Sequence, residues 1–118
     1  ALPEPPQAVF TITDLVAVGA LLAARDAGRR VPQDLALIGF SDWHVSSVMD
    51  PPISSVYQPG FDMGRRAMHL LLREMEQLQH DEAGEYQAVV LDTSLRIRKS
   101  SVVGEGVRRA PVLQGTGS

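Results

Sequence analysis

Two short, continuously apolar runs flank a helix-forming segment, and this arrangement constrains the fold more than any other feature of the chain. The runs at residues 8–12 and 35–40 are rich in strand-forming residues and do not alternate with polar ones. Thr13 and Asp14 offer an N-cap for a helix over residues 15–27, which Gly28 would end. Uninterrupted apolar strands are typical of a parallel sheet covered on both faces. The order strand, helix, strand therefore predicts an α/β fold with a right-handed crossover.

The helix over residues 15–27 is apolar nearly all round for two turns, so we expect more than one of its faces to be buried. The remaining elements follow from periodicity and from Pro and Gly breaks. We expect a loop at 1–7, one helical turn at 44–48, a strand at 53–58, an amphipathic helix at 61–79, strands at 87–91 and 95–98, and a disordered tail at 101–118.

The charge and composition limit the possible partners of this chain. The formal net charge is −3, whereas a nucleic-acid-binding surface is usually basic, so strong DNA contact by these residues is not expected. There is no cysteine, which excludes disulfides and thiolate metal sites. No apolar run approaches the length of a membrane span, and the first residues lack the basic and apolar regions of a signal peptide. These features fit a reducing compartment and predict no membrane partner.

No constellation of catalytic or metal-binding residues is recognisable. The three histidines, His44, His69 and His80, lack the spacing of metal ligands. Neither a G-x-G-x-x-G segment nor a phosphate-binding P-loop occurs, and no nucleophile stands beside an acid–base pair. The sequence therefore predicts neither an enzyme nor a cofactor or metal site.

Two polar segments stand out because each follows a predicted strand. Thr13-Asp14 follows the first strand, and Ser41-Asp42-Trp43 follows the second. Small ligands of parallel α/β sheets bind outside the carboxyl ends of the strands, where short polar side chains can meet ligand hydroxyls and Trp43 could form an apolar wall. The alternative is purely structural, with Thr13 as an N-cap, Asp42 in a turn and Trp43 covering the core. The residues alone leave both readings open.

Several segments of the chain resemble, in order, those of LacI/GalR transcription regulators. Residues 13–20 resemble the family's "ND-x-x-A-x-G" segment, and residues 28–40 resemble "G-x-x-V-P-x-D-I-x-V-x-G-F". Residues 51–59 are similar to "P-P-L-T-T-V-x-Q-P", and Met63-Gly64 to the "M-G" that follows. Residues 91–99 resemble the closing strand. Each motif alone is weak, but the ordered set over residues 8–100 is highly specific.

The resemblance implies a periplasmic-binding-protein-like (type I) core that binds a sugar or related small effector between two subdomains. Residues 8–57 and 94–100 would belong to the C-terminal subdomain, and residues 58–93 would supply a crossover, a helix and a strand to the other subdomain. Operator DNA would be bound only through a helix-turn-helix headpiece that precedes these residues in the family. The chain is thus expected to be the C-terminal part of a cytoplasmic regulator.

The family's effector contacts can be carried over position by position. Thr13 stands where an Asn is common, Ser41 where an Asp is usual, and Gln58 at the crossover near the ligand. Asp42 matches the second polar residue of the "G-F-D-D" motif, and Trp43 follows it. Thr13 and Ser41 depart from the family pattern, so a carboxylate on sugar hydroxyls would be lost unless Asp42 replaces it.

The resemblance also implies a homodimer with a self-complementary interface formed by the first helix and the segment before the double proline. The expected contacts are Val18, Leu21, Leu22, Val45, Val48 and Met49. An alternative function is an extracytoplasmic sugar-binding receptor of a transporter, which would share the fold. Residues 31–40 and 51–59 favour the regulator.

Overall fold

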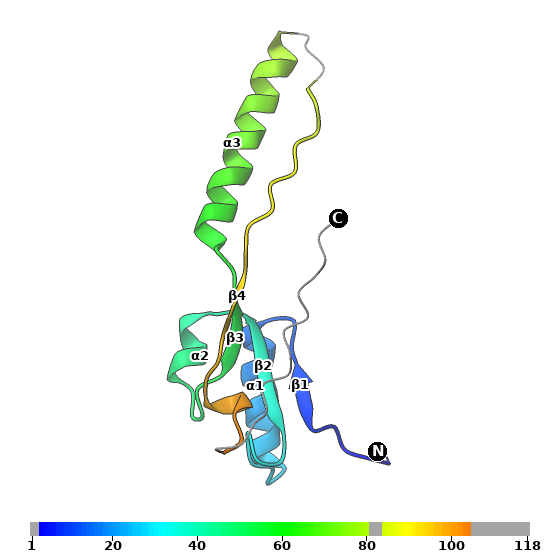
Figure 1. The fold of residues 1–118 in the computed structure, drawn as a ribbon, viewed down its shortest axis with the longest axis vertical. Coiled ribbons are helices and arrows are strands. Elements are labelled where there is room, and N and C mark those ends of the chain that lie inside the picture. The colour runs from blue at the N-terminus through cyan, green and yellow to red at the C-terminus, as the bar shows by residue number, and fades with distance from the viewer. Residues whose placement is uncertain (1–2, 81–83, 105–118) are drawn as a thin grey trace.

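The computed structural model describes residues 3–80 and 84–104, and its centre is a four-stranded sheet (Figure 1). The strands lie in the order β1-β2-β3-β4. β1 (Ala8–Phe10), β2 (Ala36–Ser41) and β3 (Ser54–Tyr57) are parallel, and β4 (Ser94–Arg96) runs antiparallel to β3. The α/β prediction with a mainly parallel sheet is confirmed, and the antiparallel strand is added at one edge.

The predicted strand–helix–strand unit forms from β1, α1 (Asp14–Asp26) and β2. The hydroxyl of Thr13 caps α1 by accepting a hydrogen bond from the Val16 amide at 3.3 Å. At the other end Gly28 adopts a left-handed φ of 67°, and the amide of Arg29 reaches back to the Ala24 carbonyl at 2.8 Å. This closure needs a positive φ, which glycine adopts without the steric cost of a Cβ.

One face of α1 packs on the sheet, and its buried residues follow helical spacing: Asp14, Ala17, Leu21 and Ala24. Ala17 and Leu21 form the core with Leu37 of β2 and Ile53, which precedes β3. Gly39 permits this close packing, because a Cβ there would overlap Asp14 Oδ1 and press on Ala17.

Within the single chain one face of α1 is buried, while Leu15 is 65% and Leu22 44% exposed, so the expected burial of a second face stays a prediction that concerns the dimer. Leu21 does not fit the predicted set of dimer contacts. It is only 2% exposed and is enclosed within the core of its own chain, out of reach of a second copy.

Buried serines, rather than apolar side chains, lie where the second half of the chain packs against the sheet. α2 (His44–Val48) contacts α1 and β3, and the 3₁₀ turn η1 (Lys99–Ser101) packs against β2 and β3. The Ser100 hydroxyl donates to the Leu37 carbonyl at 2.5 Å and accepts from the Ser54 amide at 2.8 Å. Ser101 Oγ lies 2.6 Å from Ser54 Oγ. The predicted disordered tail therefore begins too early at residue 101; residues 105–118 of that prediction lie outside the described part of the chain.

α3 (Gly60–Gln79) rises away from the sheet, and the returning segment runs beside it before β4 (Figure 1). The expected strand at residues 87–91 does not form, since residues 84–93 have neither helix nor strand. A strand needs a neighbouring strand to bond its backbone N–H and C=O groups. Within the described residues no strand pairs with this segment. None of the residues of α3 is buried, and its apolar stripe, which includes Met68, Leu71 and Met75, is about half exposed.

Candidate functional site

The carboxyl ends of β2 and β3 bring the sequence-predicted polar residues together at one edge of the sheet. Ser41, the last residue of β2, pairs in register with Tyr57 of β3. Its hydroxyl donates to Gln58 Oε1 at 3.1 Å. Because Pro59 and then α3 follow Gln58, this hydrogen bond joins the end of a strand to the crossover that leads away from the sheet. The arrangement matches the expected ligand-binding edge of a parallel α/β sheet.

Asp14 is fully buried, and its carboxylate holds the residues beside this edge in place. Its Oδ1 accepts from the Ser55 hydroxyl at 2.6 Å, and its Oδ2 accepts from the Trp43 amide at 2.6 Å. A buried carboxylate is tolerated only when it is well hydrogen-bonded, and both of these contacts are as short as charge-assisted bonds. Asp14 therefore ties the start of α1 to β3 and to the segment that follows β2. The sequence placed Asp14 at the N-cap and in the polar segment after the first strand, but it predicted neither the burial of Asp14 nor its two partners.

Residues 41–43, which we call the site loop, adopt an unusual backbone conformation. Ser41 has a φ of 104° and Asp42 a φ of 54°, both in the region that favours glycine. Each such residue costs on the order of 1–3 kcal/mol and persists only where its surroundings hold it. The Asp42 amide donates to Ser55 Oγ at 3.0 Å, so the loop is fastened to the same serine that contacts Asp14. Strain of this kind clusters at functional sites.

The carboxylate of Asp42 faces two arginines that the sequence did not single out. Its Oδ1 lies 2.7 Å from Arg98 Nη2, and its Oδ2 lies 3.9 Å from Arg96 Nε. Oδ1 is inaccessible and receives no well-aligned N–H, so its contact with Arg98 is an ion pair rather than a hydrogen bond. The expectation that Asp42 offers a carboxylate to an effector is not supported by this placement. The alternating Leu and Arg of residues 95–98 were the available signal.

The structure tests the structural readings of Thr13 and Trp43. Thr13 serves as the N-cap of α1, as its structural reading predicted. Trp43 does not cover the core: its backbone amide is held by Asp14, while 56% of the residue is exposed. The site loop thus presents an aromatic ring at the same edge as Ser41 and Gln58.

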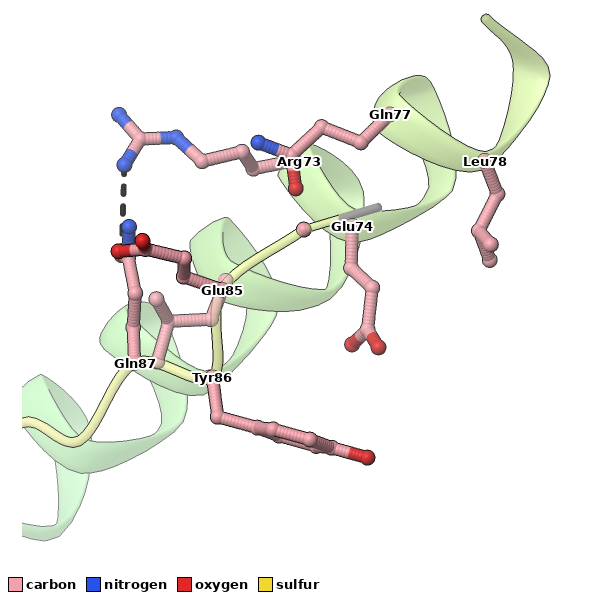
Figure 2. A pocket seen from close by; sticks show the side chains of 9 residues that line it. Arg73, Glu74, Gln77, Leu78, Glu85, Tyr86 and Gln87 are labelled. Carbon is pink, nitrogen blue, oxygen red and sulfur yellow. Dashed lines mark hydrogen bonds between the residues drawn. The ribbon is translucent and has the colours of Figure 1, made fainter. Parts of the chain in front are cut away.

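Two grooves lie along α3. One adjoins the site, with a volume of about 270 Å³, and is lined by Gln58, Pro59, Met63, Arg66, Ala67, Leu70, Val89, Leu91 and Thr93. The other, of about 250 Å³, lies toward the distal end of the helix, where the Arg73 guanidinium donates to Gln87 Oε1 at 3.4 Å (Figure 2). The first groove extends the polar edge of the sheet onto α3, whereas the second is remote from it.

Within residues 3–80 and 84–104, His, Asp and Glu side chains do not gather into a group of three that could hold a metal ion. The helices of this described part include none that is long and apolar enough to cross a membrane.

Comparison with known proteins identifies the family. The family described as "Periplasmic binding protein-like domain" matches residues 1–101. The chain is 43% identical over 100 residues to the HTH-type transcriptional repressor CytR of Escherichia coli K12, covering 85% of this chain and 28% of that protein. Among solved structures, the transcriptional regulator CelR in complex with cellobiose has 38% identity and a TM-score of 0.71 over 80% of this chain and 28% of its own.

The lac repressor dimer bound to operator and the anti-inducer ONPF is also similar, with 30% identity and a TM-score of 0.70, over 83% of this chain and 32% of that chain. The present chain thus spans a little over a quarter of the curated CytR sequence that it matches. The relatives are transcriptional repressors, not enzymes. The chain belongs to the periplasmic-binding-protein-like family, as a C-terminal part of the effector-binding domain of LacI/GalR-type regulators.

Proposed function

We propose that this chain forms one wall and the crossover of the effector site in a ligand-gated transcription regulator. The observation that carries the proposal is the hydrogen bond from Ser41 to Gln58, which joins a strand end to a crossover. Trp43, two residues after Ser41, is 56% exposed. A ligand held by these groups would contact both the sheet and the start of α3. Such a ligand can shift the relative position of the two parts, provided that it binds one arrangement better.

The effector is a small molecule of the sugar or sugar-derivative class, contacted by Thr13, Ser41, Trp43 and Gln58. Hydroxyl and amide groups can exchange hydrogen bonds with a polyol, and an aromatic ring can cover the apolar face of a sugar ring. The CelR structure contains cellobiose, which supports this class for the family neighbour. With Ser41 in place of the usual acid, recognition here rests on neutral groups.

The division of the chain follows from the same site. Residues 8–57 and 94–100 belong to one subdomain, and residues 58–93 to the other, with the two crossings at Gln58 and at residues 92–94. The separation of α3 from the sheet supports this division (Figure 1). Operator DNA would be bound by a helix-turn-helix headpiece of the whole protein, in the cytoplasm, and not by this net-acidic part.

Dimerisation would use the face formed by α1 and α2. Leu22 and Val48 are 44% and 64% exposed, whereas Val18, Val45 and Met49 are half-buried. Exposed apolar side chains on neighbouring helices are suited to a two-fold contact between copies. The lac repressor neighbour was solved as a dimer, which supports the same assembly.

The competing function is a sugar-binding receptor of a transporter, which would use the same fold. The gene separates the two directly. We expect the reading frame upstream of the codon for Ala1 to encode a helix-turn-helix segment. A secretion signal followed by the first subdomain, with no such segment, would overturn the proposal in favour of the receptor.

A further inference from the structure

The carboxylate of Asp42 belongs to a cluster of charged and aromatic side chains that lies beside the candidate site. Arg98 contacts Asp42 Oδ1, and a second nitrogen, Nη1, donates to the Ile53 carbonyl at 2.8 Å. Arg96 approaches Asp42 Oδ2, and its guanidinium carbon lies 5.3 Å from the centre of the Tyr57 ring. Cation–π contact of this kind stabilises an arginine over an aromatic face. We call Asp42, Arg96, Arg98 and Tyr57 the arginine cluster.

The arginine cluster and the site loop are mechanically connected. Asp42 and the preceding Ser41 hold left-handed conformations that a free loop would leave. The amides of Asp42 and Trp43 bind Ser55 and Asp14 on one side. The Asp42 carboxylate, only 12% exposed, binds the arginines on the other. The loop is therefore held by contacts on both sides. Its aromatic residue is Trp43.

We propose that Asp42 is a positioning residue that holds the site loop through Arg98 and Arg96, and that it does not bind the effector itself. Arg98 and Arg96 lie on the chain just after the second crossing, whereas Ser41 is bonded to Gln58 at the first. The loop thus receives one attachment from each crossing. A ligand that moves Ser41 or Trp43 would therefore act on the attachments from both crossings. Only this last step rests on the proposed function; the clamp itself can be tested without any ligand.

Trp43 is the only tryptophan of the chain, so its fluorescence reports on the site loop alone. The test compares acrylamide quenching of the wild-type chain with that of Asp42→Asn, which keeps the size and removes the charge. We expect quenching to rise, by at most the factor of about 1.8 that separates 56% from full exposure. Asp42→Glu, which keeps the charge, should restore most of the wild-type value.

The matched control is Asp34→Asn, because Asp34 also pairs with an arginine, Arg30 at 2.9 Å, but lies before β2, at the end of that strand opposite the site loop. It should leave Trp43 quenching unchanged. Far-UV circular dichroism checks that each variant is folded. Should Asp42→Asn fail to fold, Arg96→Gln removes an arginine that is 55% exposed and should raise quenching by a smaller factor.

The outcomes separate positioning from general stabilisation. A rise in quenching in the folded Asp42 or Arg96 variant, absent from the Asp34 control, supports the clamp. A folded variant that loses thermal stability while Trp43 quenching stays at the wild-type value overturns it. This result would leave the effector proposal untouched, since the measurement contains no effector.

Discussion

Asp14 offers the sharpest test of how the site is built, because one buried carboxylate holds two segments. Asp14→Ala removes the acceptors of the Ser55 hydroxyl and the Trp43 amide, each bonded at 2.6 Å. A hydrogen bond to a charged group contributes about 1.5–3 kcal/mol, and the unpaired donors left behind add to the loss. Relief from burying a charge offsets part of this. The expected net loss in the free energy of unfolding is about 3 kcal/mol.

Urea unfolding of the chain, followed by circular dichroism, measures this loss. Asp14→Asn keeps one acceptor and should lose about half as much as Asp14→Ala, on the order of 1.5 kcal/mol. Asp34→Asn, which breaks an exposed pair outside the site loop, is the control and should lose clearly less stability than Asp14→Ala. A loss below about 1 kcal/mol for Asp14→Ala would show that the two short bonds do not fasten the site loop.

Three further predictions follow from named contacts. Gly39→Ala should cost about 1–3 kcal/mol in urea unfolding, because the added Cβ overlaps Asp14 Oδ1; a neutral result would mean that α1 can shift away from the sheet. Hydrogen bonds from the side chain and then the backbone of Arg30 lower the pKa of Asp34 from 3.8 to about 2, so the stabilisation from this pair is complete above about pH 4 and is lost as the pH falls toward 2. An NMR titration of the Asp34 carboxyl should show this midpoint, and Arg30→Met should raise it toward 3.8, less the part that the backbone amide retains; an unchanged midpoint would contradict the assigned cause. If the α1–α2 face dimerises, Leu22→Lys should shift the sedimentation coefficient toward the monomer value, whereas Val90→Lys, at a residue 89% exposed outside that face, should not.

The elements that satisfy their own hydrogen bonds or pair locally were predictable from sequence. The crossover unit follows from two apolar runs, an N-cap and Gly28, and the structure has its helix at Asp14–Asp26. The strand expected at residues 87–91 was not predictable in the same way, because strand formation depends on a neighbour and not on composition alone. Valines in this segment favour a strand only where a ladder is available.

The position of the candidate site was predictable from the sequence, but the contacts between its side chains were not. Strand ends placed Ser41 and Gln58 correctly at one edge, since the carboxyl ends of parallel strands share an edge. The pairing of Asp42 with Arg98 joins residues 56 positions apart in the sequence, and no local pattern encodes it. The burial of Asp14 likewise depends on Gly39 and Ser55, which become its neighbours only after the sheet has formed.

The most direct measurement is a titration of the chain with small molecules, followed by Trp43 fluorescence. A panel of glucose, sucrose, cellobiose, gluconate and nucleosides at millimolar concentrations would be compared in wild-type, Ser41→Ala and Gln58→Ala chains. We expect a saturable change with at least one compound, weakened at least about tenfold, or about 1.4 kcal/mol, by Gln58→Ala. Because the chain supplies only one wall and the crossover of the site, we expect binding no tighter than millimolar. A saturable response that both substitutions leave unchanged would contradict the assignment of this edge as the effector site, and micromolar binding would contradict the division of the site between two parts of the protein.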